Sequence, residues 1–171
     1  MNRRAALTAG VAGVAAAAGV GWALWRQGRQ AEADAGLWSL RFDRPDGGEL
    51  VMADLRGQLL VLNFWATWCP PCVEEMPDLD RFHRDHAGRG WQVVGLAIDS
   101  PTPVREFLQR VPVTFPIGLA GLGGTELVRQ LGNPAGGLPF SVVFGRDGRA
   151  LHRKLGPTDY DELAAWARQL K

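Results

Sequence analysis

Two cysteines at a C-x-x-C spacing are the residues of this chain best suited to chemistry. Cys69 and Cys72 are its only cysteines, in the sequence Trp68-Cys69-Pro70-Pro71-Cys72. One helical turn brings the second thiol within reach of the first, so Cys72 can resolve a mixed disulfide formed on Cys69. The spacing therefore predicts thiol–disulfide exchange, with Cys69 as the nucleophile and Cys72 as the resolving thiol.

The residues around the pair predict a strand before the cysteines and a helix after them. Residues 59–64 form a continuous apolar run, which is typical of a central strand buried on both faces. Residues 73–87 have a helical pattern. A helix start supplies a positive field and free backbone N–H groups, and both favour the thiolate form of Cys69.

Two other roles for the cysteines fit the sequence less well. A static disulfide across so short a loop would remove little entropy from the unfolded chain. A zinc site would add His83 and His86, but a zinc finger needs a hairpin before its helix, whereas these residues lie in one predicted helix. We expect no metal, and we expect both histidines on the helix surface, where Asp80 can pair with His83.

The Pro70-Pro71 dipeptide bears on the direction of electron flow. Neither proline has a backbone N–H, so two donors that another dipeptide could aim at the Cys69 sulfur are missing. Fewer donors stabilise the thiolate less, and a less stabilised reduced form makes the pair more reducing. The dipeptide predicts a reductant, although two weak donors cannot alone account for the roughly 150 mV between reducing and oxidising proteins of this kind.

The stretch VLNFWATWCPPCVEEMPDL, residues 61–79, resembles the thioredoxin superfamily, and within it the membrane-associated thiol–disulfide oxidoreductases of the TlpA/ResA type. The resemblance extends from about residue 37 to the C-terminus and includes a Gly-Leu-Pro-Phe segment before a later strand. It implies an α/β, thioredoxin-like fold with a mixed central sheet, helices on both faces, N-terminal extra strands and a central helix–strand insertion. It implies no metal, nucleotide or flavin cofactor.

The resemblance also assigns residues to substrate binding. Pro139 corresponds to the cis-proline that faces the active site in this superfamily; an ordinary trans-proline is the alternative. The backbone of Leu138 would pair with the extended chain of a substrate. Trp68 would flank the cysteines as an apolar contact for that substrate.

Asn63 and Glu75 concern the proton of the second thiol. Asn63 stands six residues before the first cysteine, where thioredoxin has a buried aspartate that accepts this proton. Asparagine cannot titrate. In the TlpA/ResA type a glutamate three residues past the second cysteine has been implicated instead, and Glu75 occupies that place. We predict that Glu75, partly desolvated, tunes or relays the proton of Cys72. A solvated carboxylate on the helix surface is the alternative.

The remaining pattern completes the sheet and its helices. An alternating edge strand is expected at residues 37–42. Further strands are expected at residues 49–52, 91–98, 115–119, 140–144 and 149–155, and helices at 103–110, 125–131 and 159–170.

The first 35 residues form a separate unit from the thioredoxin-like domain expected at residues 36–171. Residues 5–25 carry no charge, with Arg3 and Arg4 before them. At about 1.5 Å per residue such a run can span a hydrocarbon core of roughly 30 Å. It predicts a signal anchor, with a cleaved signal peptide or a buried core helix as alternatives. The basic N-terminus places the cysteines on the periplasmic side of a bacterial inner membrane.

Charge and family suggest the partners. Residues 36–171 carry 15 basic and 16 acidic residues, which gives no reason to expect nucleic-acid binding. The expected substrate is a protein disulfide, in cytochrome c maturation or on a metallochaperone. The family implies re-reduction by a membrane thiol donor of the CcdA/DsbD type. A disulfide oxidase or isomerase, and a copper-binding thiol chaperone without catalysis, remain alternatives.

Overall fold

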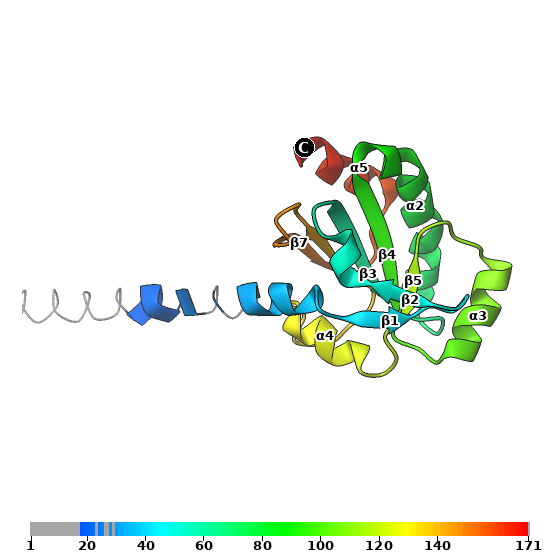
Figure 1. Cartoon of the computed structure of the whole chain (residues 1–171), viewed down its shortest axis with the longest axis horizontal. Helices are drawn as coiled ribbons and strands as arrows, with labels where there is room; N and C mark the ends of the chain where they lie inside the picture. Colours follow the sequence, from blue (N-terminus) through cyan, green and yellow to red (C-terminus); the bar gives the residue numbers. More distant parts are fainter. Residues whose placement is uncertain (1–17, 23, 26–27, 29, 171) are drawn as a thin grey trace, which may run out of the picture.

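The computed structural model describes residues 18–22, 24–25, 28 and 30–170. Within these residues the strands form one sheet of order β2-β1-β5-β4-β3-β6-β7 (Figure 1). The strands are β1 (Arg41–Asp43), β2 (Glu49–Val51), β3 (Leu59–Trp65), β4 (Trp91–Ala97), β5 (Ile117–Leu119), β6 (Phe140–Phe144) and β7 (Ala150–Leu155).

The sheet is mixed, and β3 lies inside it. β3 pairs in parallel with β4 and antiparallel with β6, while β1 pairs antiparallel with both β2 and β5. All seven residues of β3 are buried, as its apolar sequence, interrupted only by Asn63, predicts. The cysteines follow the C-terminal end of this strand.

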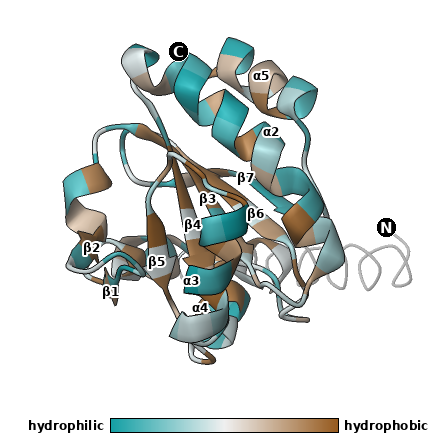
Figure 2. Ribbon diagram, turned by 90° about the vertical axis from the view of Figure 1, so that its right-hand side faces the viewer, coloured by the Kyte–Doolittle hydropathy of each residue, from teal (hydrophilic) through white to brown (hydrophobic). Residues whose placement is uncertain are grey.

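Helices cover both faces of the sheet. They are α2 (Pro70–His86), α3 (Pro101–Arg110), α4 (Gly124–Gln130) and α5 (Tyr160–Gln169), with short 3-10 turns η1 (Met52–Leu55) and η2 (Ala87–Arg89). Apolar residues of α2, α3 and α5 share one core cluster, which includes both cysteines. Apolar residues of α4 belong to the cluster on the opposite face. Figure 2 shows the largely apolar strands of the sheet, with helices that carry both polar and apolar residues, as expected of amphipathic helices.

The predicted fold class is confirmed. The extra N-terminal strands are β1 and β2, and α3, β5 and α4 lie between β4 and β6. Most predicted elements match within three residues, but the edge strand expected at 37–42 is wrong in its first four residues, because β1 begins at Arg41. Helix continues to Leu37, and a turn follows in which the Leu40 N–H donates to the Leu37 carbonyl. Leu37 and Trp38 are both buried, which a helix end permits and an alternating edge strand does not.

The helical residues before Trp38 pack against the domain. The buried Asp34 carboxylate accepts hydrogen bonds from the Ala150 N–H (3.0 Å) and from the Arg153 guanidinium (2.8 Å) on β7. Gln30 donates to the Gln130 carbonyl at the end of α4 (3.2 Å). These contacts cover part of the free edge of β7.

The predicted anchor at residues 5–25 lies mostly outside the described residues. Among the residues that the structure does describe, no helix combines the length and apolar character needed to cross a membrane.

Candidate active site at the start of helix α2

The two cysteines lie at the start of α2 and form a disulfide. Cys69 is the N-cap residue, and Pro70 and Pro71 are the first two residues of the helix. Proline suits these positions because their N–H groups would have no partner within the helix. The two sulfurs are 2.05 Å apart. Cys69 is 5% exposed and Cys72 is fully buried, so only Cys69 can be approached from outside.

The loop between β3 and α2 is held by an aspartate that the sequence analysis did not single out. Asp99, which follows β4, accepts hydrogen bonds from the Thr67 N–H (3.1 Å) and hydroxyl (2.5 Å). Because β3 and β4 are parallel neighbours, their C-terminal ends meet at this point. The next residue, Trp68, is left 65% exposed beside Cys69.

The segment before β6 forms a loop with a cis peptide bond between Leu138 and Pro139. The Asn133 side chain donates to the Gly137 carbonyl (2.8 Å), and the Gly156 N–H donates to the Pro139 carbonyl (2.9 Å). Leu138 packs against the core cluster that contains both cysteines. Among the described residues, no hydrogen-bond partner occupies its backbone N–H or carbonyl.

Glu75 lies one turn after Cys72 and is buried, with 3% of its surface exposed. One carboxylate oxygen accepts from the Asn63 amide (2.7 Å) and the other from the Thr158 N–H (2.7 Å). The same Asn63 amide donates to the Ser141 hydroxyl (3.1 Å). The structure therefore places Asn63 and Glu75 in direct contact, and Glu75 is not a solvated surface group.

Burial raises the pKa of Glu75 from 4.5 to about 7. The hydrogen bonds from Thr158 and Asn63, and the charge of Lys154, act in the opposite direction, while the charge of Glu162 adds to the rise. A carboxyl group that titrates near neutral pH can both accept and release a proton under physiological conditions. This chemistry suits an acceptor for the proton of a buried thiol.

The histidines of α2 differ from expectation. Asp80 does not pair with His83; it forms an ion pair with Arg84 and accepts from the Thr114 hydroxyl (2.7 Å). His83 is half-buried, and among the described residues its Nδ1 has no hydrogen-bond partner. Asp80 instead bonds to Thr114 in the loop before β5. His86 stacks on the Phe82 ring at 4.2 Å. Desolvation lowers the pKa of His83.

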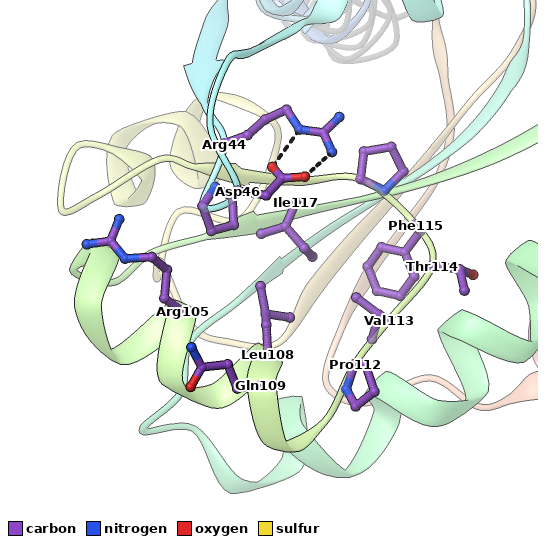
Figure 3. A pocket seen from close by; sticks show the side chains of 12 residues that line it. Arg44, Asp46, Arg105, Leu108, Gln109, Pro112, Val113, Thr114, Phe115 and Ile117 are labelled. Carbon is purple, nitrogen blue, oxygen red and sulfur yellow. Dashed lines mark hydrogen bonds and ion pairs between the residues drawn. The ribbon is translucent and has the colours of Figure 1, made fainter.

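Two hollows in the surface lie away from the cysteines. One, of about 660 Å³, lies between α3, β5 and the β1–β2 turn, where Figure 3 shows the Arg44–Asp46 pair and Phe115 among its lining residues. The other, of about 750 Å³, is lined by residues of α2 and α5 such as His86 and Tyr160. The cysteines and Trp68 line neither of these two hollows, and the Trp68 side chain lies exposed on the outer surface.

Comparison with known proteins agrees with this geometry. The chain matches the Redoxin family over residues 37–168. Thiol-disulfide oxidoreductase ResA of Bacillus cereus is 26% identical over 126 residues, covering 73% of this chain and 70% of the relative. Sporulation thiol-disulfide oxidoreductase A of Bacillus subtilis is 28% identical over 126 residues, covering 71% and 74%.

Solved structures share the fold. A thiol:disulfide interchange protein of the thioredoxin family from Chlorobium tepidum superposes with a TM-score of 0.64 at 29% identity, covering 75% of this chain and 92% of the other. StoA of Bacillus subtilis superposes with a TM-score of 0.62 at 24% identity, covering 75% and 95%. Since the family match spans well over half of the chain and includes both cysteines, the chain belongs to the Redoxin family, as a thiol–disulfide oxidoreductase with a thioredoxin-like fold of the TlpA/ResA type.

Proposed function

We propose that this chain is an exported disulfide reductase that acts on the disulfides of other proteins. The assignment as a reductant, rather than an oxidant, is supported by the position of Pro70 and Pro71 as the first two residues of α2. At these positions a backbone N–H would point toward the N-terminal end of the helix and the Cys69 sulfur. Because the two prolines lack these N–H groups, the Cys69 thiolate is less stabilised, and the reduced pair gives up its electrons more readily.

The catalytic cycle follows from the different burial of the two sulfurs. The Cys69 thiolate attacks a substrate disulfide, and the first substrate sulfur leaves as a thiolate. Cys72 then loses its proton to Glu75 and attacks the Cys69 sulfur, which expels the second substrate thiolate. Two electrons pass from the pair to the substrate, and the pair becomes the disulfide that the structure shows.

A protein substrate fits the surface around Cys69. Trp68 presents an exposed aromatic face next to the nucleophile. The unpaired N–H and carbonyl of Leu138 offer a short edge to which an extended substrate segment can add as a strand. Reduction of apocytochrome cysteines before haem attachment, or of a metallochaperone's thiols, would use such a surface.

Export and membrane attachment are part of the proposal. Among the described N-terminal residues, large apolar side chains that are at least half exposed are those of Val20, Trp22, Leu24 and Trp25. Such a surface is unfavourable in water and suits an apolar environment. The cysteine domain would then stand on the periplasmic side of the inner membrane. A membrane thiol donor of the CcdA/DsbD type would return two electrons to the Cys69–Cys72 disulfide.

The reduction potential of the full chain tests the direction of electron flow. The protein is equilibrated in glutathione or dithiothreitol redox buffers, and tryptophan fluorescence reports the oxidised fraction. We expect a two-electron transition near or below about −250 mV. A value between about −120 and −180 mV would instead indicate an oxidase or isomerase. Tight stoichiometric Cu(I) binding without disulfide exchange would indicate a copper-binding chaperone.

A further inference from the structure

An ion pair lies next to the buried Glu75 carboxylate on the side away from Asn63. Lys154 of β7 contacts Glu162 of α5, and their side chains are 29% and 32% exposed. Lys154 stands opposite Ser141 in the β6–β7 register, and Ser141 is part of the hydrogen-bonded group around Glu75. The pair is therefore reached by solvent on one side and faces the buried group on the other.

Thr158 connects this ion pair to Glu75. Its backbone N–H donates to Glu75 Oε2 (2.7 Å), and its hydroxyl donates to Glu162 Oε2 (2.9 Å). Thr158 is itself buried, with 4% of its surface exposed. Glu162 Oε2 thus accepts from both Thr158 and Lys154. A single buried residue separates Glu75 from a charged pair at the surface.

We propose that the Lys154–Glu162 pair acts as a positioning element that sets the protonation of Glu75, and through it the release of the Cys72 proton. This inference rests on the proposed role of Glu75 in the reductase cycle. The two charges have opposite effects, because a cation favours the carboxylate form of Glu75 and an anion favours the protonated form.

Among the described residues, the two strands packed against Glu75 contribute no charge. β3 presents Asn63 and β6 presents Ser141, both uncharged. On α2 itself, Glu74 is exposed, Asp78 is partly exposed one turn after Glu75, and Cys72 is the group whose proton is in question. Within the described part of the chain, the charges that shift the pKa of Glu75 are those of Lys154 and Glu162.

The test measures the titration of Glu75 directly, by carbon-13 NMR of its carboxyl group in the oxidised full chain. The signal is assigned by its loss in Glu75→Gln. We expect Lys154→Gln to move the titration midpoint upward and Glu162→Gln to move it downward, each by about half a pH unit or more. Lys154→Arg keeps the charge and should stay close to the parent midpoint.

Matched controls change charges that do not face Glu75. Asp161→Asn and Arg168→Gln lie on α5 at exposed positions, and both should leave the midpoint in place. Each variant is first shown to unfold cooperatively, so that a misfolded sample is recognised. Midpoints that do not move, or that move in the same direction for Lys154→Gln and Glu162→Gln, would overturn the proposal.

A second readout links the pair to the thiols. In the reduced full chain, the pH at which disulfide exchange reaches half of its maximal rate should shift in the same direction as the Glu75 midpoint. Because the carboxyl titration uses oxidised protein without substrate, the ion-pair proposal can fail while the reductase function stands. If the unsubstituted chain reduced no protein disulfide, this result would refute the proposed function instead.

Discussion

The raised pKa of Glu75 makes the stability of the oxidised protein depend on pH in a direction unusual for a carboxyl group. Burial shifts this pKa from 4.5 to about 7. Between these values the folded chain holds a proton that the unfolded chain has lost, so stability falls as pH rises. At about 1.4 kcal/mol for each pKa unit, the loss amounts to about 3 kcal/mol between pH 4.5 and pH 7, and it is constant above that.

The substitution Glu75→Gln removes this proton and should remove the slope. The assay is urea unfolding of the oxidised full chain, parent and variant, at several values between about pH 4.5 and about pH 8. Stability of the variant relative to the parent should rise by about 3 kcal/mol across this range. The substitution also changes the free energy of unfolding by an amount that does not depend on pH, because the NH2 group of Gln would face an N–H donor of Asn63 or Thr158. The unpartnered Oδ1 of Asn63 can turn toward that amide and limit the cost.

The pH dependence of the difference, rather than its absolute value, decides the result. Glu74→Gln is the matched control, because Glu74 is the exposed neighbour on the same helix. Its difference from the parent should stay flat with pH. A flat difference for Glu75→Gln as well, or one that favours the parent as pH rises, would refute the assignment of a titration near neutral pH to Glu75.

Three further predictions concern other parts of the site and its support. Pro70→His restores a backbone N–H near Cys69 and should raise the reduction potential by tens of mV, measured in redox buffers; a lower potential would contradict the effect assigned to the prolines. Trp68→Ala should lower kcat/KM for a protein disulfide about tenfold while oxidised dithiothreitol reacts as before, and equal losses for both would exclude a substrate contact. Asp80→Ala leaves the Thr114 N–H without its acceptor and should cost about 2 kcal/mol in urea unfolding, whereas an unchanged midpoint would show that the bond adds no stability.

The elements that carry the chemistry could be predicted because their signals are local. The apolar run of β3 and the helical pattern after Cys72 are each contained in fewer than twenty residues. The cysteine spacing then places the pair at the junction of these two elements. The position of Glu75, one turn after Cys72, follows from the same helix. Nothing beyond neighbouring residues is needed for any of these predictions.

The partners of Glu75 could not be predicted in the same way. Thr158 is 83 residues away in the sequence and Ser141 is 78 residues from Asn63. These contacts depend on the antiparallel pairing of β6 with β3 and on the entry of α5, which no local pattern specifies. Asp34 and its partner Arg153 are separated by 119 residues and were missed for the same reason.

The error at Asp80 shows how a local rule fails. Spacing of three residues on a helix makes His83 a natural partner, and the rule holds where both side chains are on an exposed face. Asp80 is buried at 6% exposure, so its desolvated carboxylate needs stronger donors. The Thr114 backbone and the Arg84 guanidinium supply them. Burial, which the sequence does not give directly, therefore decided the pairing.

Glu75 lies one helical turn after the inner cysteine, Cys72, and the two thiols differ in their need for a proton acceptor. Cys69 lies at the surface edge of the helix start, whereas Cys72 is fully buried and needs an acceptor inside the protein. Transfer from a thiol of pKa about 8.5 to a carboxylate of ordinary pKa would cost about 5 kcal/mol. With the pKa of Glu75 at about 7, the cost falls to about 2 kcal/mol. The burial that weakens the oxidised fold at neutral pH thus lowers the cost of the proton transfer that the proposed reductase cycle assigns to Glu75.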